Sequence, residues 1–225
     1  MRLVTVAHGT RKRTANATAV EVTRRAAERL GLEAVTSYVE LCEPLLVDVL
    51  ADSDEPSIVV PLLLSTGYHL RQDLPAAAEG RPAVVGRPLG PHALLAAAQV
   101  DRLLLTGAER GSPLVMVAAG SSDPLATRDL ERAAYLLGRA WGSPVRVATM
   151  SGLGERLEAV VRPGDVVSPY LLAGGLFADR AARASREAGA VAVAEVIGAH
   201  DAVVDLLCRR VTAQLRADLP GLQHA

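Results

Sequence analysis

The sequence predicts an α/β protein of two similar domains, each a four-stranded parallel sheet flanked by helices. Short apolar runs alternate with amphipathic segments along the chain, which is typical of strands and helices in turn. The alternation stops once, in a stretch rich in glycine at residues 107–113, and then starts again. Strands that alternate with helices form right-handed βαβ units, so we expect the strands of each sheet to run parallel.

The first strand is predicted at residues 3–7, and it ends abruptly at His8-Gly9-Thr10. The segment after it spaces its apolar residues at helical intervals and stops at Gly31, a common residue just past a helix end. One face of this helix is expected to carry Ala19, Val22, Ala26 and Leu30. These elements make up the first strand-loop-helix unit of the chain.

A second strand is predicted at residues 34–39, followed by Glu40, and residues 41–50 turn into a short helix. The third strand, residues 58–64, is a continuous apolar run, as expected of a strand buried on both faces of a parallel sheet. Ser65, Thr66 and Gly67 break that run, so His69 is predicted to follow the carboxyl end of a central strand. This edge is where open α/β sheets bind their ligands.

Asp73 resembles a helix N-cap with Pro75 in the first turn, and it closes the loop that carries His69. A fourth strand is predicted at residues 83–85, before a long apolar helix at residues 92–105. The last helix of the chain carries its apolar residues on one face: Val204, Leu207, Val211 and Leu215.

The chain is an internal duplication, which predicts one domain over residues 1–108 and a second over residues 112–225. The sequence LVMVAAGS at residues 114–121 matches LVTVAHGT at residues 3–10, position for position. Further matches join residues 167–175 to residues 59–67, and Ile197-Gly-Ala-His200 to Leu89-Gly-Pro-His92. A period of about half the chain is too long for a solenoid and suits two similar domains.

Composition excludes several classes of protein. The net charge of −1 and an aromatic content of 3% argue against a nucleic-acid partner, which would require a basic surface or stacking platforms. Cys42 and Cys208 form no C-x-x-C pair, so neither a disulfide scaffold nor a structural zinc site is indicated. No apolar run reaches ~18 residues and no signal peptide is apparent, so we expect a soluble, cytoplasmic protein without membrane contact.

The duplication permits an internal comparison of the strand ends. In the first half, three successive strands are followed by His8, Glu40 and His69. The matching positions of the second half carry different residues, namely Ala119, Ser151 and Phe177. A requirement of the fold acts on both halves, so polar groups present in one half only indicate a site. Two imidazoles and a carboxylate can bind Fe²⁺, Co²⁺, Ni²⁺ or Zn²⁺, and they can also act as bases.

Each of these residues has a simpler interpretation. A single histidine at a strand end can be a surface or capping residue, and Glu43 competes with Glu40 for the carboxylate role. His92 and His200 recur in both halves, which favours a role at helix starts. The basic residues near the site form either a solvated patch or a grip on an anionic substrate; these are Arg11, Lys12, Arg13 and Arg71.

Three motifs resemble, in order and spacing, those of the sirohydrochlorin chelatase family of class II chelatases. They are VAHGTR at residues 6–11, YVELCEP at residues 38–44 and PLLLSTGYHLRQDLP at residues 61–75. GSSDP at residues 120–124 resembles the degenerate half of the longer, two-domain members. The likeness covers essentially the whole chain; Thr10 stands where serine is commoner.

The resemblance implies that His8 and His69 are the metal-binding and catalytic histidines and that Glu40 is the assisting carboxylate. It implies a tetrapyrrole with many carboxylates as substrate, a divalent cation (Co²⁺, Fe²⁺ or Ni²⁺) as the second substrate, and no prosthetic group. The pathway would be cobalamin or siroheme biosynthesis, and a monomer is expected. Substrate binding is assigned to the residues around the histidines: Arg11, Arg13, Arg71, Ser65, Thr66, Gly67 and Tyr68.

Two competing functions are considered. Histidine phosphatases also place His-Gly at a strand end, but an arginine precedes their histidine, whereas Ala7 precedes His8 here. A two-lobed carrier of metal or tetrapyrrole is the alternative without catalysis, and turnover would separate it from a chelatase. The chain has no phosphate-binding G-x-x-x-x-G-K-[ST] loop, so no nucleotide is expected.

Overall fold

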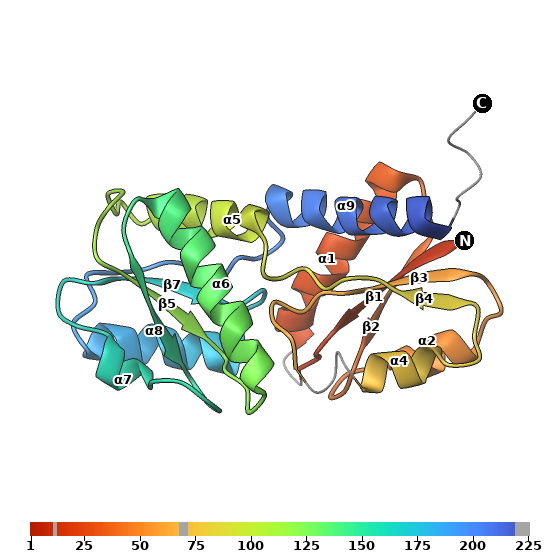
Figure 1. Ribbon diagram of the computed structural model, residues 1–225, viewed down its shortest axis with the longest axis horizontal. Coiled ribbons are helices and arrows are strands. Elements are labelled where there is room, and N and C mark those ends of the chain that lie inside the picture. The colour runs from red at the N-terminus through yellow and green to blue at the C-terminus, as the bar shows by residue number, and fades with distance from the viewer. Residues whose placement is uncertain (11–12, 68–71, 219–225) are drawn as a thin grey trace.

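The computed structural model describes residues 1–10, 13–67 and 72–218, and every structural statement below refers to these residues. They form two four-stranded sheets, one in each half of the chain, with helices on both faces of each sheet (Figure 1). All strand pairs within the sheets are parallel. The fold class predicted from the sequence is confirmed.

The first sheet has the strand order β2-β1-β3-β4. Its strands are β1 (Arg2–Ala7), β2 (Ala34–Tyr38), β3 (Ser57–Pro61) and β4 (Ala83–Val85). The helices between them are α1 (Arg13–Leu30), α2 (Leu46–Ala51) and α4 (Asp73–Ala78). Asp73 was expected to be the N-cap of α4, but it is the first helical residue and Gln72 precedes it.

The second sheet repeats this arrangement in the order β6-β5-β7-β8. Its strands are β5 (Leu114–Ala118), β6 (Val145–Thr149), β7 (Val166–Tyr170) and β8 (Ala192–Val193). Its helices are α6 (Pro124–Trp141), α7 (Leu157–Val160) and α8 (Leu176–Glu187). Each half ends in one further helix, α5 (Ala93–Leu104) in the first and α9 (Asp201–Asp218) in the second.

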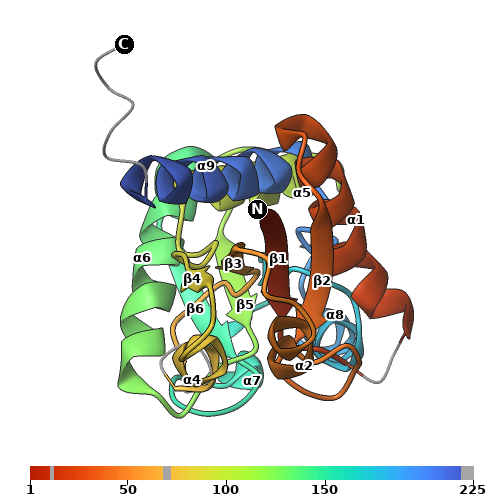
Figure 2. The same ribbon diagram turned by 90° about the vertical axis from the view of Figure 1, so that its right-hand side faces the viewer.

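The two halves exchange these last helices. Helix α5 follows β4 in the chain, yet it packs against α6 and β7 of the second half. Helix α9 ends the second half, yet it packs against α1 and β3 of the first half, and α5 and α9 also contact each other. Figures 1 and 2 show α9 over the first sheet, on the side opposite α2 and α4. The division near residues 108–112 stays a prediction, and each side of it carries a helix that covers the other side.

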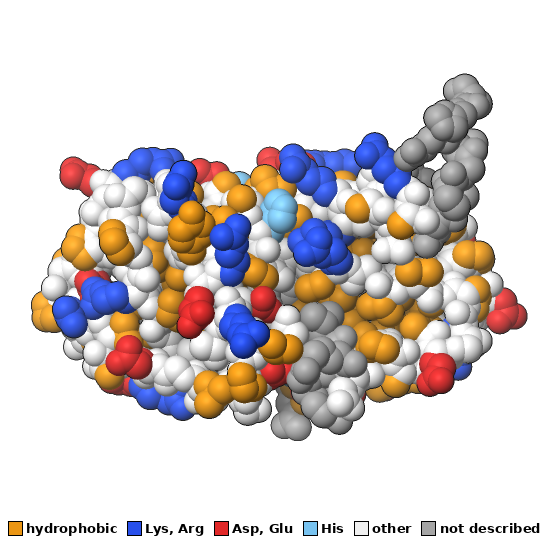
Figure 3. All heavy atoms as spheres, viewed as in Figure 1, with side chains coloured by type: hydrophobic (Ala, Val, Ile, Leu, Met, Phe, Trp, Pro, Cys, Tyr) orange, Lys and Arg blue, Asp and Glu red, His pale blue; other side chains and the backbone are white. Residues whose placement is uncertain are grey.

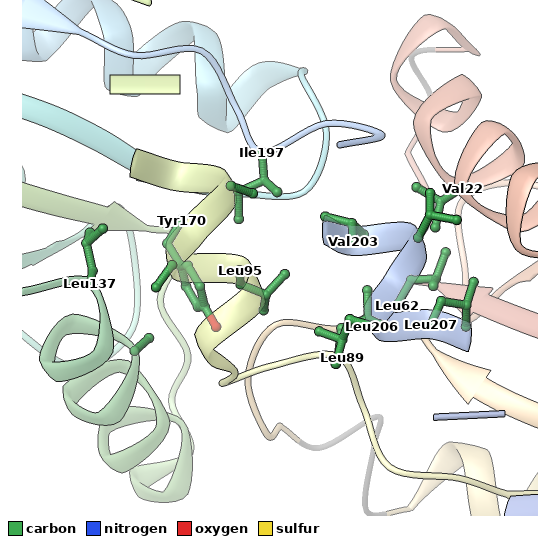
Figure 4. Packing of buried hydrophobic residues seen from close by; sticks show 14 of the residues in the cluster. Val22, Leu62, Leu89, Leu95, Leu137, Tyr170, Ile197, Val203, Leu206 and Leu207 are labelled. Atoms are coloured by element: carbon green, nitrogen blue, oxygen red, sulfur yellow. The ribbon is translucent and has the colours of Figure 1, made fainter. Parts of the chain in front are cut away.

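The exchange produces one apolar core that runs through both halves. It includes Leu3 and Val22 of the first half, Leu137 and Trp141 of the second, and Leu207 of α9, all of them buried. Figure 4 shows side chains of α5 and α9 meeting in this core between the two sheets. Separate apolar clusters lie on the opposite faces, below α2 and α4 in one half and below α7 and α8 in the other.

His92 and His200 begin the two exchanged helices, as expected from their recurrence in both halves. The Nδ1 atom of His92 accepts a hydrogen bond from the Leu94 backbone N–H at 3.1 Å, and His200 makes the same bond with Ala202 at 3.1 Å. Each imidazole therefore caps one of the N–H groups that a helix start leaves without an intrahelical partner.

Candidate functional site

The strand ends named in the sequence analysis meet at one edge of the molecule. A cavity of about 530 Å³ opens there between the two halves. Its walls come from four segments that follow β1, β3, β5 and β7, namely residues 7–10, 62–67, 118–122 and 170–174, together with parts of α1 and α6. A volume of this size lies within the range of small-molecule pockets, which is roughly 300–1,000 Å³.

His8 and Glu40 lie next to each other at this edge. Tyr38 is paired with Ala7 at the ends of β2 and β1, so the residues that follow the two strands come together. The His8 Nε2 atom is 3.5 Å from the Glu40 Oε1 atom, and the Glu40 backbone N–H donates to the His8 carbonyl oxygen at 3.2 Å. The side chain of His8 is 52% exposed and lines the cavity, so a ligand can reach the imidazole.

A glycine permits this close approach of the two strand ends. Gly9 has φ of 95°, and a Cβ atom there would stand 1.9 Å from the Glu40 carbonyl oxygen. The second half repeats the arrangement with Gly120, whose φ is 86° and whose Cβ atom would stand 1.9 Å from the Ser151 carbonyl oxygen. The backbone is thus duplicated, whereas the imidazole and the carboxylate are present in the first half only.

The remaining predicted site residues divide into two groups. Ser65, Thr66 and Gly67 line the cavity, and their part in substrate binding stays a prediction. Four predicted residues lie outside the described residues, and these are His69, Arg11, Arg71 and Tyr68. The backbone of Arg13 belongs to α1, and its side chain is outside the description. Among the described residues, no cluster of three or more His, Cys, Asp or Glu side chains could hold a metal ion.

The sequence analysis missed the side chains that hold the cavity walls. The amide of Asn16 donates to the Thr10 carbonyl oxygen at 2.8 Å and so steadies the loop after His8. Tyr170 and Asp129 of the second half bind the loop after β3. The sequence did contain one sign of such a contact, namely a tyrosine in an apolar strand, β7. A buried phenol requires a hydrogen-bond partner, so Tyr170 could be expected to bind a group at the strand end.

One face of the molecule mixes charged and apolar side chains. On the face shown in Figure 3, arginine side chains are interspersed with acidic and apolar ones, and the described residues there form no continuous basic surface. Helices long and apolar enough to cross a bilayer are likewise absent from the part of the chain that the structure describes.

A comparison with known protein families identifies the chain. The family model described as CbiX matches it twice, over residues 2–105 and again over residues 113–214. The chain belongs to the CbiX family. The two matches of this CbiX protein fall on its two halves, in agreement with the internal duplication, and the chelatase resemblance drawn from the sequence motifs is confirmed.

Individual relatives agree with this membership. The sirohydrochlorin ferrochelatase of Priestia megaterium is 30% identical over 179 residues, which cover 70% of this chain and 67% of the relative. The solved structure of SirB from Bacillus subtilis with Fe³⁺ matches with a TM-score of 0.80 and 24% identity over 98% of both chains. SirB from Bacillus subtilis subspecies spizizenii, a sirohydrochlorin chelatase in complex with cobalt, matches with a TM-score of 0.78, 24% identity and coverage of 99% and 98%. The structural matches establish a shared fold.

Proposed function

We propose that this protein inserts a divalent cation, Co²⁺, Fe²⁺ or Ni²⁺, into sirohydrochlorin or a closely related tetrapyrrole. The reaction would make it a lyase of cobalamin or siroheme biosynthesis. One observation carries the proposal: an imidazole and a carboxylate meet at the mouth of a cavity between the halves, and the second half lacks both groups. Membership of the CbiX family and the ferrochelatase relative support it.

Metal insertion requires three things of a protein: it must hold the ion, accept two protons from pyrrole nitrogens, and orient the macrocycle. A neutral imidazole can bind a first-row metal ion or take up a proton, and His8 is exposed to the cavity for either task. Glu40 lies beside the His8 imidazole, where its carboxylate can orient the ring. The same carboxylate supplies a hard oxygen ligand for a divalent cation.

His69 is proposed as the second histidine of the site, on the basis of the sequence motif alone. The apolar character of much of the cavity wall suits the flat face of a macrocycle, whereas Arg11, Arg13 and Arg71 are proposed to bind its peripheral carboxylates. The reaction needs no prosthetic group in this scheme, because the metal ion is a substrate.

Both halves of one chain build the cavity, so a monomer suffices for activity, and we propose that the protein works as a monomer. Cys42 and Cys208 are free thiols, which is compatible with a reducing compartment such as the cytoplasm.

Turnover tests the proposal directly. Purified protein is mixed with metal-free sirohydrochlorin and a tenfold excess of Co²⁺, Fe²⁺ or Ni²⁺ in turn, and absorbance follows the metallated product. A chelatase converts many equivalents of tetrapyrrole per protein, whereas a carrier stops after one. Stoichiometric binding without turnover would therefore overturn the proposal in favour of a carrier.

A further inference from the structure

The loop of residues 62–67 connects β3 to the segment that contains His69, and it forms one wall of the cavity opposite the other half. Two backbone hydrogen bonds within the described part of the first half reach this loop. Leu62 N–H donates to the Val6 carbonyl oxygen at 2.8 Å, and Gly90 N–H donates to the Leu63 carbonyl oxygen at 3.1 Å. Two further hydrogen bonds to this loop come from side chains of the second half.

Tyr170 provides the first of these bonds. Its hydroxyl group donates to the Leu64 carbonyl oxygen at 2.9 Å, although 106 residues separate the two in sequence. The tyrosine is 3% exposed, and burial raises the pKa of Tyr170 with the Asp129 carboxylate as a further cause, so the phenol keeps the proton that it donates. Figure 4 shows its hydroxyl oxygen directed away from Ile197 in the core.

Gly90 makes room for this contact. A Cβ atom at Gly90 would stand 2.1 Å from the Leu64 carbonyl oxygen and 2.5 Å from the Tyr170 hydroxyl oxygen. Both distances are far below van der Waals contact, so a larger residue at position 90 would separate the donor from the acceptor.

Asp129 provides the second bond, two residues further along the loop. Its Oδ2 atom accepts a hydrogen bond from the Thr66 backbone N–H at 2.6 Å, and bonds to an ionised acceptor are shorter and stronger than neutral ones. Asp129 belongs to α6, whose 18 residues are anchored in the common core through Leu130, Leu137 and Trp141. The loop is therefore tied to a rigid helix of the other half.

The duplication shows that the fold itself does not require these two side chains. Helices α1 and α6 have equal lengths, and the position in α1 that matches Asp129 is Thr18. Strands β3 and β7 correspond in the same way, and the position that matches Tyr170 is Leu62. The half without the imidazole and the carboxylate is thus the half that carries the two loop-binding groups.

We propose that Asp129 and Tyr170 are positioning residues, which fix the 62–67 wall of the cavity so that the bound macrocycle meets His8 in reactive geometry. The inference rests on the proposed metal insertion and assigns a task to the half that lacks the candidate site residues. Displacement of a reactant by about 1 Å can cost roughly 10²-fold in rate, so two hydrogen bonds to this wall are sufficient to affect the chemical step.

The test compares Asp129→Ala, Asp129→Asn and Tyr170→Phe in the metal-insertion assay with sirohydrochlorin and Co²⁺. Asp129→Ala removes the acceptor for the Thr66 N–H, and Tyr170→Phe removes the donor to Leu64. We expect each to lower kcat about 10-fold with a KM within about 2-fold of the wild type, because positioning acts on the bound complex. Asp129→Asn keeps an oxygen acceptor, so it should restore most of kcat.

Glu131→Ala on the exposed side of α6 serves as the matched control, because Glu131 lies away from the 62–67 loop. Melting temperatures and the amide exchange rate of Thr66 accompany the kinetics. The inference is overturned if wild type turns over while Asp129→Ala and Tyr170→Phe keep full kcat, whatever their melting temperatures. It is also overturned if Asp129→Asn is as impaired as Asp129→Ala. Absence of turnover in the wild type itself would instead defeat the proposed function, and a positioning role in that reaction with it.

Discussion

The Nε2 atom of His8 lies 3.5 Å from the Oε1 atom of Glu40, although the two residues follow different strands. Parallel pairing of β1 with β2 brings them together, since Ala7 and Tyr38 are register partners at the ends of those strands. The same pairing in the second half brings Ala119 next to Ser151, where the Ser151 hydroxyl group donates to the Ala119 carbonyl oxygen at 2.8 Å. The second half of the protein thus shows the same backbone arrangement without the imidazole and the carboxylate.

His8→Ala should abolish most activity without loss of stability. The matching residue Ala119 shows that the fold accepts alanine here, and the His8 side chain is half exposed. We expect metal insertion to fall by at least ~10²-fold, as for loss of a positioned base or ligand, with a nearly unchanged melting temperature. His200→Ala is the control: loss of its helix cap should cost about 1 kcal/mol and leave turnover intact. Full activity in His8→Ala would contradict the proposed mechanism.

Glu40→Gln and Glu43→Gln should separate the two candidate carboxylates. Glutamine preserves the shape of the side chain but removes its charge, and the Glu40 carboxylate is the one beside His8. Loss of a carboxylate that orients a metal-binding histidine typically costs 10–100-fold, so we expect about that loss in Glu40→Gln and almost none in Glu43→Gln. Metal titrations at fixed tetrapyrrole concentration measure the effect. A larger loss in Glu43→Gln would reverse the assignment.

Gly9→Ala and Gly120→Ala should destabilise the protein alike, but the first should lower activity far more than the second. Both glycines have positive φ, and at both a Cβ atom would strike a carbonyl oxygen at 1.9 Å. We expect each change to cost more in urea unfolding than the ~1–3 kcal/mol of backbone strain alone, because the clash with the carbonyl oxygen adds to it. Gly9→Ala also displaces Glu40 from His8, whereas Gly120→Ala displaces Ser151. Gly31→Ala, where a Cβ atom meets nothing within 4 Å, measures the cost of positive φ alone. Equal activities for Gly9→Ala and Gly120→Ala would show that the His8–Glu40 geometry is unimportant.

His92 should make the stability of the protein depend on pH. Burial, followed by the charges of Arg210, Arg209 and Arg87, lowers the pKa of His92 from its ordinary value of 6.5. The folded state then binds fewer protons than the unfolded state at acid pH. The cap contribution is therefore complete above about pH 6.5 and is lost as pH falls through the lowered pKa.

His92→Asn provides the comparison, because asparagine caps helices and does not titrate in this range. Urea unfolding between about pH 5 and 8 should give similar stabilities for wild type and variant at the neutral end. Below about pH 6.5 the wild type should lose stability faster than the variant. Parallel curves over the whole range would exclude His92 as the source of the pH dependence.

Much of the fold follows from local patterns in the sequence. The apolar runs at residues 3–7 and 58–64 contain most of the central strands β1 and β3, because strands covered by helices on both faces are largely apolar. The predicted third strand was too long, since β3 ends at Pro61 and residues 62–64 belong to the cavity wall. Gly31 ends α1 with φ of 65°, as the glycine after a helix was expected to do. The repeated motifs predicted the second sheet, which has the same strand order as the first.

The exchange of α5 and α9 could not be predicted in this way. The spacing of Val204, Leu207 and Val211 shows that α9 has an apolar face, and all three residues are buried. An apolar face is compatible with either sheet, since both expose a similar apolar surface to their helices. Hydrophobic periodicity therefore predicts that one face of a helix is buried, but it does not predict which sheet or helix buries that face.

The sequence predicted which side chains meet at the candidate site but missed the residues that support its walls. His8 and Glu40 were found because the duplication revealed polar residues in one half only, and the structure places them side by side. Asp129 was missed because an acidic residue on a long helix is normal at the surface, and its partner is a backbone N–H group distant in sequence. Such contacts between side chain and backbone leave no periodic signal.

The packing of α9 on α1 and β3 also has a consequence for biosynthesis on the ribosome. The helix that completes the apolar core of the first half is synthesised only after the strands of the second half. Until α9 emerges, Val22 and its neighbours on α1 have no cover on that side, so the nascent first half exposes apolar surface while the second half is translated. Contacts between such distant segments close slowly, and exposed intermediates of this kind are prone to aggregation. The first half therefore depends on a helix that is translated after the second half, or on a chaperone until that helix arrives.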